Sequence, residues 1–227
     1  MPRIARRVIE DIPHHITQRG NNKQDVFFVD DDRTAYLEIL KKQSDQYGLT
    51  VMGYCLMANH IHLIAVPHKA DSLAKAVGRT HFIYTQYINR LHKRSGHLWQ
   101  GRFYSCALDN AHLLYAMRYI ERNPLRAKVC RQAWNYKWSS ASAHIDEKKK
   151  NDLLDLKSWF KIMGGDDWKK LLMTDLDKSE VMRIRNNTHT GRPLGSDSFL
   201  SKLEKRIGRR LRPLPVGRPH KKGVKNR

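Results

Sequence analysis

Two histidines, His60 and His62, stand two positions apart in a short apolar run. In a β-strand successive side chains point to opposite faces, so both imidazoles would project from one face and Ile61 and Leu63 from the other. A pair of imidazoles placed in this way can hold a divalent cation. The alternative is an uninvolved pair, because a chain with 12 histidines produces this spacing readily by chance.

Tyr119 and Asn123 form a second candidate pair. Residues four apart share one face of a helix, so the phenol and the amide would project together. An amide oxygen is a ligand for a hard cation such as Mg²⁺ or Mn²⁺. A tyrosine oxygen can act as a covalent nucleophile, here toward a phosphodiester. The alternative is a core tyrosine followed by a helix-capping asparagine.

Two further stretches could meet a nucleic acid. Residues 99–104 combine aromatic side chains with Arg102 and a glycine, a mixture that can stack on bases and bind phosphate. Residues 14–21 end in polar side chains, Arg19 among them, which could contact a phosphate backbone. A core strand and an edge strand with its turn are the respective alternatives.

These residues need a scaffold, and the hydrophobic pattern predicts the order β-α-β-β-α-β-α. The predicted strands are 8–19, 50–57, 60–66 and 98–108, with residues 58 and 59 as a tight turn. The predicted helices are 31–47, 72–91 and 111–121, the last stopped before Pro124. This order predicts an α+β fold: a ferredoxin-like, split βαβ antiparallel sheet with helices on one face.

The charge balance narrows the class of partner. Lys and Arg number 43 against 22 Asp and Glu, which gives a net charge of +21. This excludes an ordinary acidic metabolic enzyme and favours a polyanion, most often nucleic acid. No apolar run is long enough to cross a membrane, and no secretory signal is visible, so a cytoplasmic, nucleoid-associated protein is expected. Three cysteines without a CxxC spacing disfavour a disulfide framework or a cysteine zinc site.

Composition predicts three segments. Residues 1–145 carry the candidate chemistry, 146–190 form a helical extension, and 191–227 form a basic, DNA-binding tail. Two Gly-Arg-Pro sequences, centred on Arg192 and Arg218, look like the core of peptides that insert arginine into the DNA minor groove. Between them, apolar residues recur at helical spacing, so 196–211 could be a helix docked on the protein or on DNA. The alternative is a disordered basic arm.

Four ordered blocks together resemble the REP-associated tyrosine transposases, which are domesticated bacterial relatives of the single-tyrosine HUH transposases. HUH denotes two histidines around one hydrophobic residue. The blocks are 16–21, 54–63, 98–103 and 119–127, and residues 138–140 and 191–211 also fit. The resemblance covers nearly the whole chain and is weakest between residues 146 and 187.

The resemblance implies specific roles. His60 and His62 would match the histidine pair that holds Mg²⁺ or Mn²⁺, and Asn123 would match the third ligand. Tyr119 would match the nucleophile. Tyr115, one helical turn earlier, is the rival, but it lies outside the Tyr-Ile-x-x-Asn-Pro block.

The implied activity is cleavage and strand transfer of single-stranded DNA at hairpin-forming extragenic palindromes, through a 5′-phosphotyrosine. Arg19, Arg102 and Arg126 are the first candidates for DNA contact, together with the tail arginines. Relatives include both monomers and homodimers. A sequence-specific hairpin-binding protein with lost or unused catalysis is the main alternative, and a metal phosphohydrolase that uses water is a more distant one.

Overall fold

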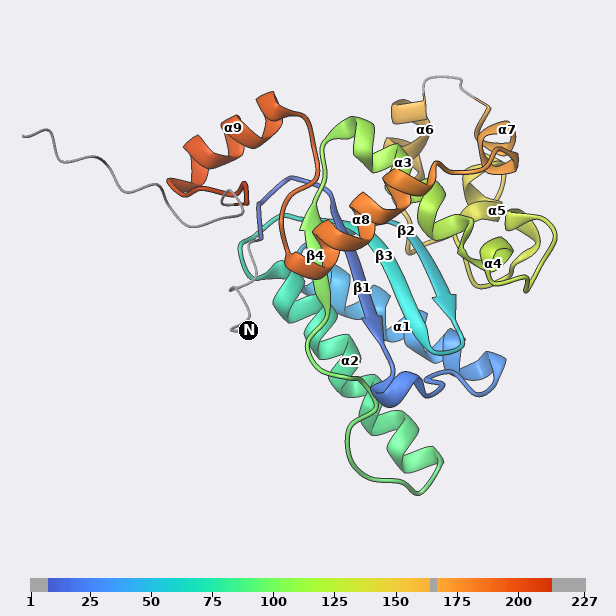
Figure 1. The fold of residues 1–227 in the computed structure, drawn as a ribbon. Helices are drawn as coiled ribbons and strands as arrows, with labels where there is room; N and C mark the ends of the chain where they lie inside the picture. Colours follow the sequence, from blue (N-terminus) through green and yellow to red (C-terminus); the bar gives the residue numbers. More distant parts are fainter. Residues whose placement is uncertain (1–7, 164–166, 214–227) are drawn as a thin grey trace, which may run out of the picture.

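The computed structural model describes residues 8–163 and 167–213. Its centre is a four-stranded antiparallel sheet in the order β2-β3-β1-β4 (Figure 1). The strands are β1 (His14–Arg19), β2 (Leu49–Met57), β3 (His60–Pro67) and β4 (Tyr104–Ala107). β1 and β2 flank β3, and α1 connects them, which is the split βαβ arrangement.

Helices surround this sheet. The longer ones are α1 (Asp30–Tyr47), α2 (Ser72–Leu91), α3 (Asn110–Glu121), α8 (Lys178–Thr190) and α9 (Asp197–Ile207). The shorter ones are α4 (Asn123–Arg126), α5 (Ala141–His144), α6 (Leu156–Met163) and α7 (Trp168–Met173), with 3₁₀ turns η1 (Asn21–Lys23) and η2 (Ala133–Asn135). Within the described ranges, no helix is long and apolar enough to span a membrane.

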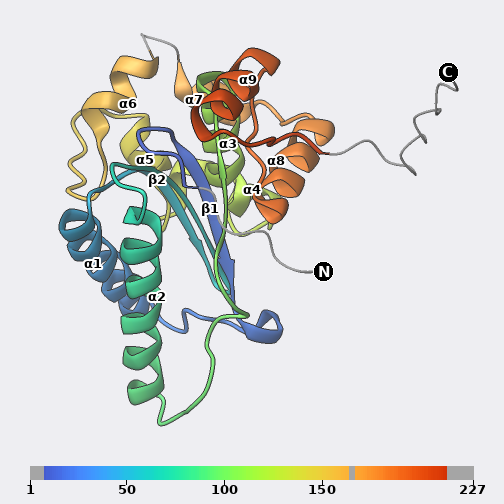
Figure 2. The ribbon, with the colours of Figure 1, turned by 90° about the vertical axis from the view of Figure 1, so that its left-hand side faces the viewer.

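The predicted α+β class with an antiparallel sheet is confirmed, with one correction: helices cover both faces. α1 and α2 pack on one face through a core that includes Ile16, Leu63 and Tyr84. The opposite face is covered by α3 and α8, which contribute Met117 and Ile184 to a second core (Figure 2). A local sequence period shows that a helix is amphipathic but not which face of the sheet it covers.

The β2–β3 hairpin positions the histidine pair. It turns at residues 58 and 59, as predicted, with Met57 opposite His60. Ile61 points into the core beneath α1 and α2, so His60 and His62 face α3. The alternation predicted for this strand is confirmed.

Several predicted boundaries are corrected. The first strand begins only at His14, after Pro13 and a residue with positive φ at Asp11. The stretch 98–108 is regular strand only over β4. α3 ends at Glu121, but Arg122 stays in the right-handed helical region and α4 continues the turn, because a proline is tolerated in the first turn of a helix.

Segments from outside the sheet cover its edges. Along β2, Leu56 N donates to Trp138 O at 2.9 Å, and Asp155 N donates to Val51 O at 3.0 Å. At the other edge, Leu194 N donates to Ala107 O at 2.8 Å, and α8 packs beside β4. Both edge strands therefore bond to the protein's own backbone.

Candidate active site

A cavity of about 460 Å³ opens between the sheet and helices α3 and α8. It contains the four residues that the sequence predicts as the centre of the site, and arginines line it. The lining residues are His15, Thr17, Gln18, Arg19, His60, His62, Gln100, Tyr104, Tyr119, Asn123, Arg126, Arg185, Thr188 and His189.

The histidine pair forms part of the lining of this cavity. The His60 and His62 ring centroids are 5.2 Å apart, with the rings nearly perpendicular. His60 Nδ1 donates to Asn59 Oδ1 at 2.7 Å, which leaves Nε2 as an acceptor, and Asn123 Nδ2 donates to it at 3.0 Å. Arg126 donates to the other end of the same amide, Asn123 Oδ1, at 2.7 Å. The amide therefore turns its nitrogen toward the histidine and its oxygen toward the arginine.

The end of α3 is fixed by the residues between Tyr119 and Asn123. Glu121 is fully buried, and its carboxylate accepts from Trp168 Nε1 at 2.8 Å and from Ser140 Oγ. His144 Nδ1 lies 2.6 Å from the same carboxylate. Arg122 donates to Leu172 O and pairs with Asp175. These contacts tie α3 to the helical extension, so the phenol and the amide are held on one face as predicted.

Tyr119 is almost fully buried in the cavity wall. Its ring meets the rings of His62 and His15 edge-on, at centroid distances of 5.4 and 5.8 Å. The Arg126 guanidinium lies over the ring at 4.3 Å. Arg185 Nε donates to Tyr119 Oη at 3.3 Å. The Arg185 guanidinium therefore places a positive charge beside the phenol oxygen.

Burial favours the neutral form of three histidines in the cavity, His15, His60 and His62. It lowers the pKa of His15 to about 3. Burial first, and then the charges of Arg19 and Arg126, lower the pKa of His60 to about 4. Burial also holds the pKa of His62 well below its ordinary value, with His15 and His60 adding to the effect. A neutral imidazole keeps the lone pair that a metal ion requires.

The other predicted residues fall in different places. Arg19 and Arg126 line the cavity. Arg102 is exposed and lies outside the cavity lining. Arg192 lines a separate small hollow with Arg210 and Arg212, and Arg218 is outside the described residues.

The Gly-Arg-Pro sequence around Arg192 belongs to the folded protein. Gly191 ends α8 with a φ of 72°, and Arg192 N donates to Asn187 O at 3.1 Å. Asn187 Nδ2 donates to Pro193 O at 2.9 Å. This backbone is bonded to the protein, so only the Arg192 side chain is available to a DNA groove.

Sequence reasoning missed several lining residues, namely His15, Arg185, Thr188 and His189. His15 had a usable signal, because it shares a strand face with Thr17, which pairs with His62 across β1 and β3. The three others lie on α8, far along the chain, and no local pattern brings α8 to the cavity. Tyr115 is partly exposed and is not among the cavity-lining residues.

Comparison with known proteins identifies the family. A sequence model described as "Transposase IS200 like" matches residues 8–123, which is just over half of the chain. The chain belongs to the IS200-like transposase family. This confirms the resemblance seen in the sequence, and it implies a DNA-cleaving enzyme in general terms. A search of curated proteins finds no match.

Two solved structures are similar to this IS200-like transposase. One is a REP-associated tyrosine transposase bound to a REP hairpin, with a TM-score of 0.54 and 14% identity over 69% of this chain and 93% of that chain. At this identity the likeness confirms the fold. The other is a proposed transposase from Deinococcus radiodurans R1, with a TM-score of 0.38 and 19% identity over 53% of this chain and 97% of that chain.

The family as a rule uses a divalent metal, and the cavity residues fit one. Two neutral imidazole nitrogens and one amide oxygen are suitable ligands for Mg²⁺ or Mn²⁺. No cluster of three His, Cys, Asp or Glu side chains suited to a metal occurs in the described part of the chain. Asn123 is therefore the third candidate ligand, and its oxygen must turn away from Arg126 to serve.

Proposed function

We propose that this protein cleaves and rejoins single-stranded DNA at hairpin-forming palindromes, with Tyr119 as the nucleophile. The observation that carries the proposal is the meeting of the Tyr119 phenol, the His60–His62 pair and Asn123 in one arginine-lined cavity. The solved REP-associated transposase is described as bound to a REP hairpin, which supports hairpin DNA as the substrate class.

In the proposed reaction, Tyr119 Oη attacks the phosphorus of a phosphodiester. The bond from phosphorus to the 3′ oxygen breaks, the phenol proton ends on that oxygen, and a 5′-phosphotyrosine forms beside a free 3′-OH. The reverse attack by a second 3′-OH joins strands, so no external energy source is needed.

Side chains of the cavity would act on both reactants, the phosphodiester and the Tyr119 phenol. His60, His62 and Asn123 would hold Mg²⁺ or Mn²⁺, which when bound polarises a phosphate oxygen. Arg185 donates to Tyr119 Oη and so places a positive charge beside the oxygen that would attack the phosphorus. Arg19 and Arg126 would bind the phosphates that flank the scissile bond.

We also propose a division of labour along the chain. Residues 1–145 supply the nucleophile and the metal ligands, residues 146–190 brace α3 and complete the cavity, and residues 191–227 bind DNA. Arg102, Arg192 and Arg218 would contact DNA outside the cavity. Such a protein acts where chromosomal DNA lies, in the cytoplasm and at the nucleoid, as a monomer or a homodimer.

The test uses hairpin oligonucleotides with a single-stranded flank, labelled at either end, incubated with Mn²⁺ and resolved on a denaturing gel. The expected product is a protein–DNA adduct that keeps the 3′ label. Tyr119→Phe should abolish the adduct, and the matched variant Tyr115→Phe should retain it.

Two other outcomes would overturn the proposal. Cleavage without an adduct would indicate a phosphohydrolase that uses water. Tight hairpin binding without any cleavage would indicate a binding protein whose catalytic residues are unused.

A further inference from the structure

We propose that α9 presents a binding surface for the phosphate backbone of the DNA duplex, separate from the catalytic cavity. The surface consists of Lys202, Lys205, Arg206 and Arg209, here called the α9 basic face. The inference rests on the proposed function, because it assigns this face to the duplex stem of the same hairpin.

The first step is that α9 folds and docks without DNA. Leu203 and Leu211 are 4% exposed and pack with Ile9 and Ala107. Ser196 caps the helix by accepting from Phe199 N at 3.2 Å. The apolar side of α9 is therefore buried against the rest of the protein, and this packing fixes the position of α9 relative to β4.

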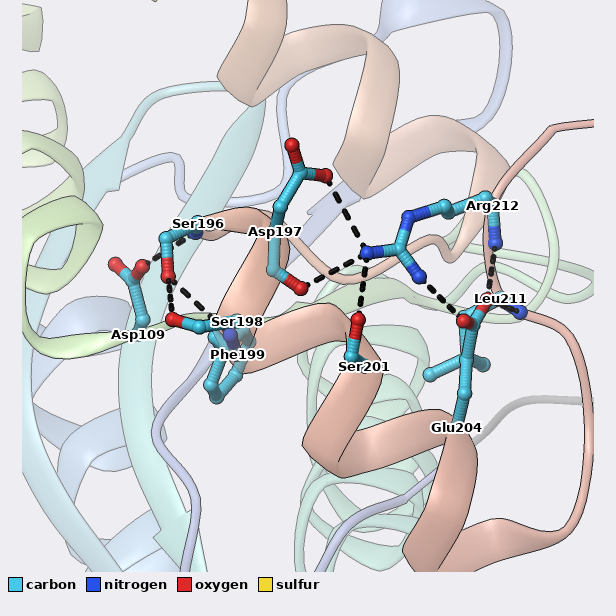
Figure 3. Close-up of polar contacts among 9 residues, drawn as sticks. All are labelled: Asp109, Ser196, Asp197, Ser198, Phe199, Ser201, Glu204, Leu211 and Arg212. Carbon is cyan, nitrogen blue, oxygen red and sulfur yellow. Dashed lines mark hydrogen bonds and ion pairs between the residues drawn. The ribbon is translucent and has the colours of Figure 1, made fainter.

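The second step is that the acids of α9 are engaged on the flank away from the basic face. Glu204 accepts from the backbone N–H groups of Leu211 at 2.7 Å and Arg212 at 3.1 Å, and it pairs with the Arg212 guanidinium (Figure 3). That guanidinium also donates to Asp197 O at 2.8 Å and to Ser201 Oγ at 3.0 Å (Figure 3). Arg212 thus folds the chain back over α9 and forms an ion pair with each of these two acids.

The third step is that the basic side chains of α9 remain exposed to solvent. The four side chains of the α9 basic face are exposed, and none forms an ion pair with a described residue. Arg206 donates to Glu10 O at 3.3 Å, which leaves its charge uncompensated. Lys202, Lys205 and Arg206 stand at i, i+3 and i+4, so they lie on one side of α9, and Arg209 follows the capping Gly208 just beyond the end of the helix. Four uncompensated cations on a docked helix suit a regular polyanion, and duplex DNA carries a phosphate on each strand at every base step.

The fourth step is continuity with the cavity. His189 at the end of α8 lines the cavity, and the link from Gly191 leads directly into α9. Hydrogen bonds from Arg192 and Leu194 hold that link to α8 and β4. A hairpin could therefore place its single-stranded flank in the cavity while its stem lies on the α9 basic face.

The test replaces all four residues by glutamine. The matched control replaces Lys42, Lys148, Lys149 and Lys150, which are also exposed, so that it removes the same charge. Binding to a hairpin with a single-stranded flank, and to the flank alone, is measured over a range of salt. We expect the α9 variant to bind the hairpin at least tenfold more weakly at 0.15 M salt. Its salt slope should fall by about 3 to 4 for four lost phosphate contacts.

Flank binding and flank cleavage should stay within twofold of the unchanged protein. Equal weakening by both variants would overturn the inference in favour of net charge alone, and an unchanged α9 variant would overturn it outright. If the unchanged protein binds no hairpin, the proposed function itself fails.

A second, independent observation concerns the cavity wall. We infer that Thr188 and His15 fix which nitrogen of His62 carries its proton, which makes both positioning residues. Thr188 Oγ donates its single proton to Ile184 O at 2.7 Å within α8. The hydroxyl can then only accept from His15 Nδ1, at 2.7 Å, and from the Cys106 thiol, at 3.2 Å.

The position of the proton on His15 determines the position of the proton on His62, because the two rings share a hydrogen bond. With its proton on Nδ1, the His15 ring accepts at Nε2, and His62 Nδ1 is the donor at 2.9 Å. His62 Nε2 is thereby left with its lone pair. A histidine whose second nitrogen donates to a fixed partner is a better oriented metal ligand. Thr188, which fixes the tautomer, lies on α8 and therefore outside residues 8–123, which the family model matches.

The test compares Thr188→Val, which removes the acceptor, with Thr188→Ser, which retains it. ¹⁵N NMR of the metal-free protein reports the His62 tautomer directly, and calorimetry with Mn²⁺ alone reports affinity. We expect an Nδ1–H tautomer in the unchanged protein and in Thr188→Ser. Thr188→Val should show a mixed or reversed tautomer and about 10- to 100-fold weaker Mn²⁺ binding.

A Thr188→Val protein that keeps the Nδ1–H tautomer of His62 would overturn the inference. The tautomer measurement needs no metal, so it decides this point even if the protein binds no Mn²⁺, which would count against the proposed function instead.

Discussion

Replacing Arg126 by glutamine should tighten Mn²⁺ binding to the DNA-free protein, although it removes an arginine from the cavity that we propose binds DNA. Arg126 holds Asn123 Oδ1 at 2.7 Å, and the amide nitrogen occupies the lone pair of His60 Nε2 at 3.0 Å. The amide oxygen must leave the arginine before it can bind a metal ion. Arg126 therefore holds Asn123, the third candidate ligand, in an orientation in which its oxygen cannot bind a metal ion.

The magnitude follows from the strength of that bond. A hydrogen bond to a charged group contributes about 1.5–3 kcal/mol, and exposure of Arg126 to solvent reduces this to about 1 kcal/mol. We therefore expect about fivefold tighter Mn²⁺ binding. The loss of a positive charge near the metal also favours Mn²⁺, so a control for charge is needed.

Arg185→Gln is that control. It removes the same charge from the same cavity, but Arg185 bonds to Tyr119 and not to Asn123. Mn²⁺ affinities are measured by calorimetry for both variants. An equal gain of Mn²⁺ affinity in the two variants, or no gain in Arg126→Gln, would refute this role of Arg126. In a Tyr119→Phe background, uncleaved DNA should raise Mn²⁺ affinity more with Arg126 present than without it, because a phosphate would draw the arginine away.

Four further predictions concern Tyr119, Arg185, Gly53 and His15. Tyr119→Phe should lose all detectable adduct while its hairpin affinity stays within about threefold, as measured by filter binding; a persistent adduct would place the nucleophile elsewhere. Arg185→Gln should slow cleavage by about 10- to 100-fold through loss of a charged hydrogen bond to Tyr119 Oη, as followed in single-turnover gels; an unchanged rate would exclude it as an activator. Gly53→Ala should lower the free energy of unfolding by about 1–3 kcal/mol in urea, because the new Cβ would lie 2.3 Å from Met117 Sδ. The matched change Gly78→Ala in α2 meets nothing within 4 Å and should stabilise by about 0.5–1 kcal/mol; equal effects would contradict the packing argument. Stability should fall as pH drops below about 6.5, because the pKa of buried His15 is lowered to about 3 and the unfolded chain binds more protons. His15→Phe should flatten that fall in urea titrations at pH 7, 6 and 5, and a slope equal to that of the unchanged protein would count against it.

The sequence predicts those parts of the site that depend on local spacing. The period of two in β3 places His60 with His62, and the helical period places Tyr119 with Asn123. Both follow from backbone geometry alone. The order of strands and helices along the chain and the hairpin at residues 58 and 59 were also predictable, because turns and apolar runs are local.

The remaining contacts depend on tertiary packing. His15 and Thr188 are 173 positions apart, and no period links them. The two-sided covering of the sheet was missed because the apolar stripe of α3 does not specify which face it covers. The strand predicted from residue 8 begins at 14, because Pro13 and the positive φ of Asp11 interrupt the extended backbone.

The covered sheet edges constrain how two copies could associate. The backbone groups of β2 that face outward already bond to Trp138 and Asp155, and β4 ends against Leu194. A continuous sheet across two subunits would require these bonds to break first. Any homodimer that forms without unfolding must therefore meet through helices or side chains. The same closed edges guard against strand-by-strand aggregation at high local concentration.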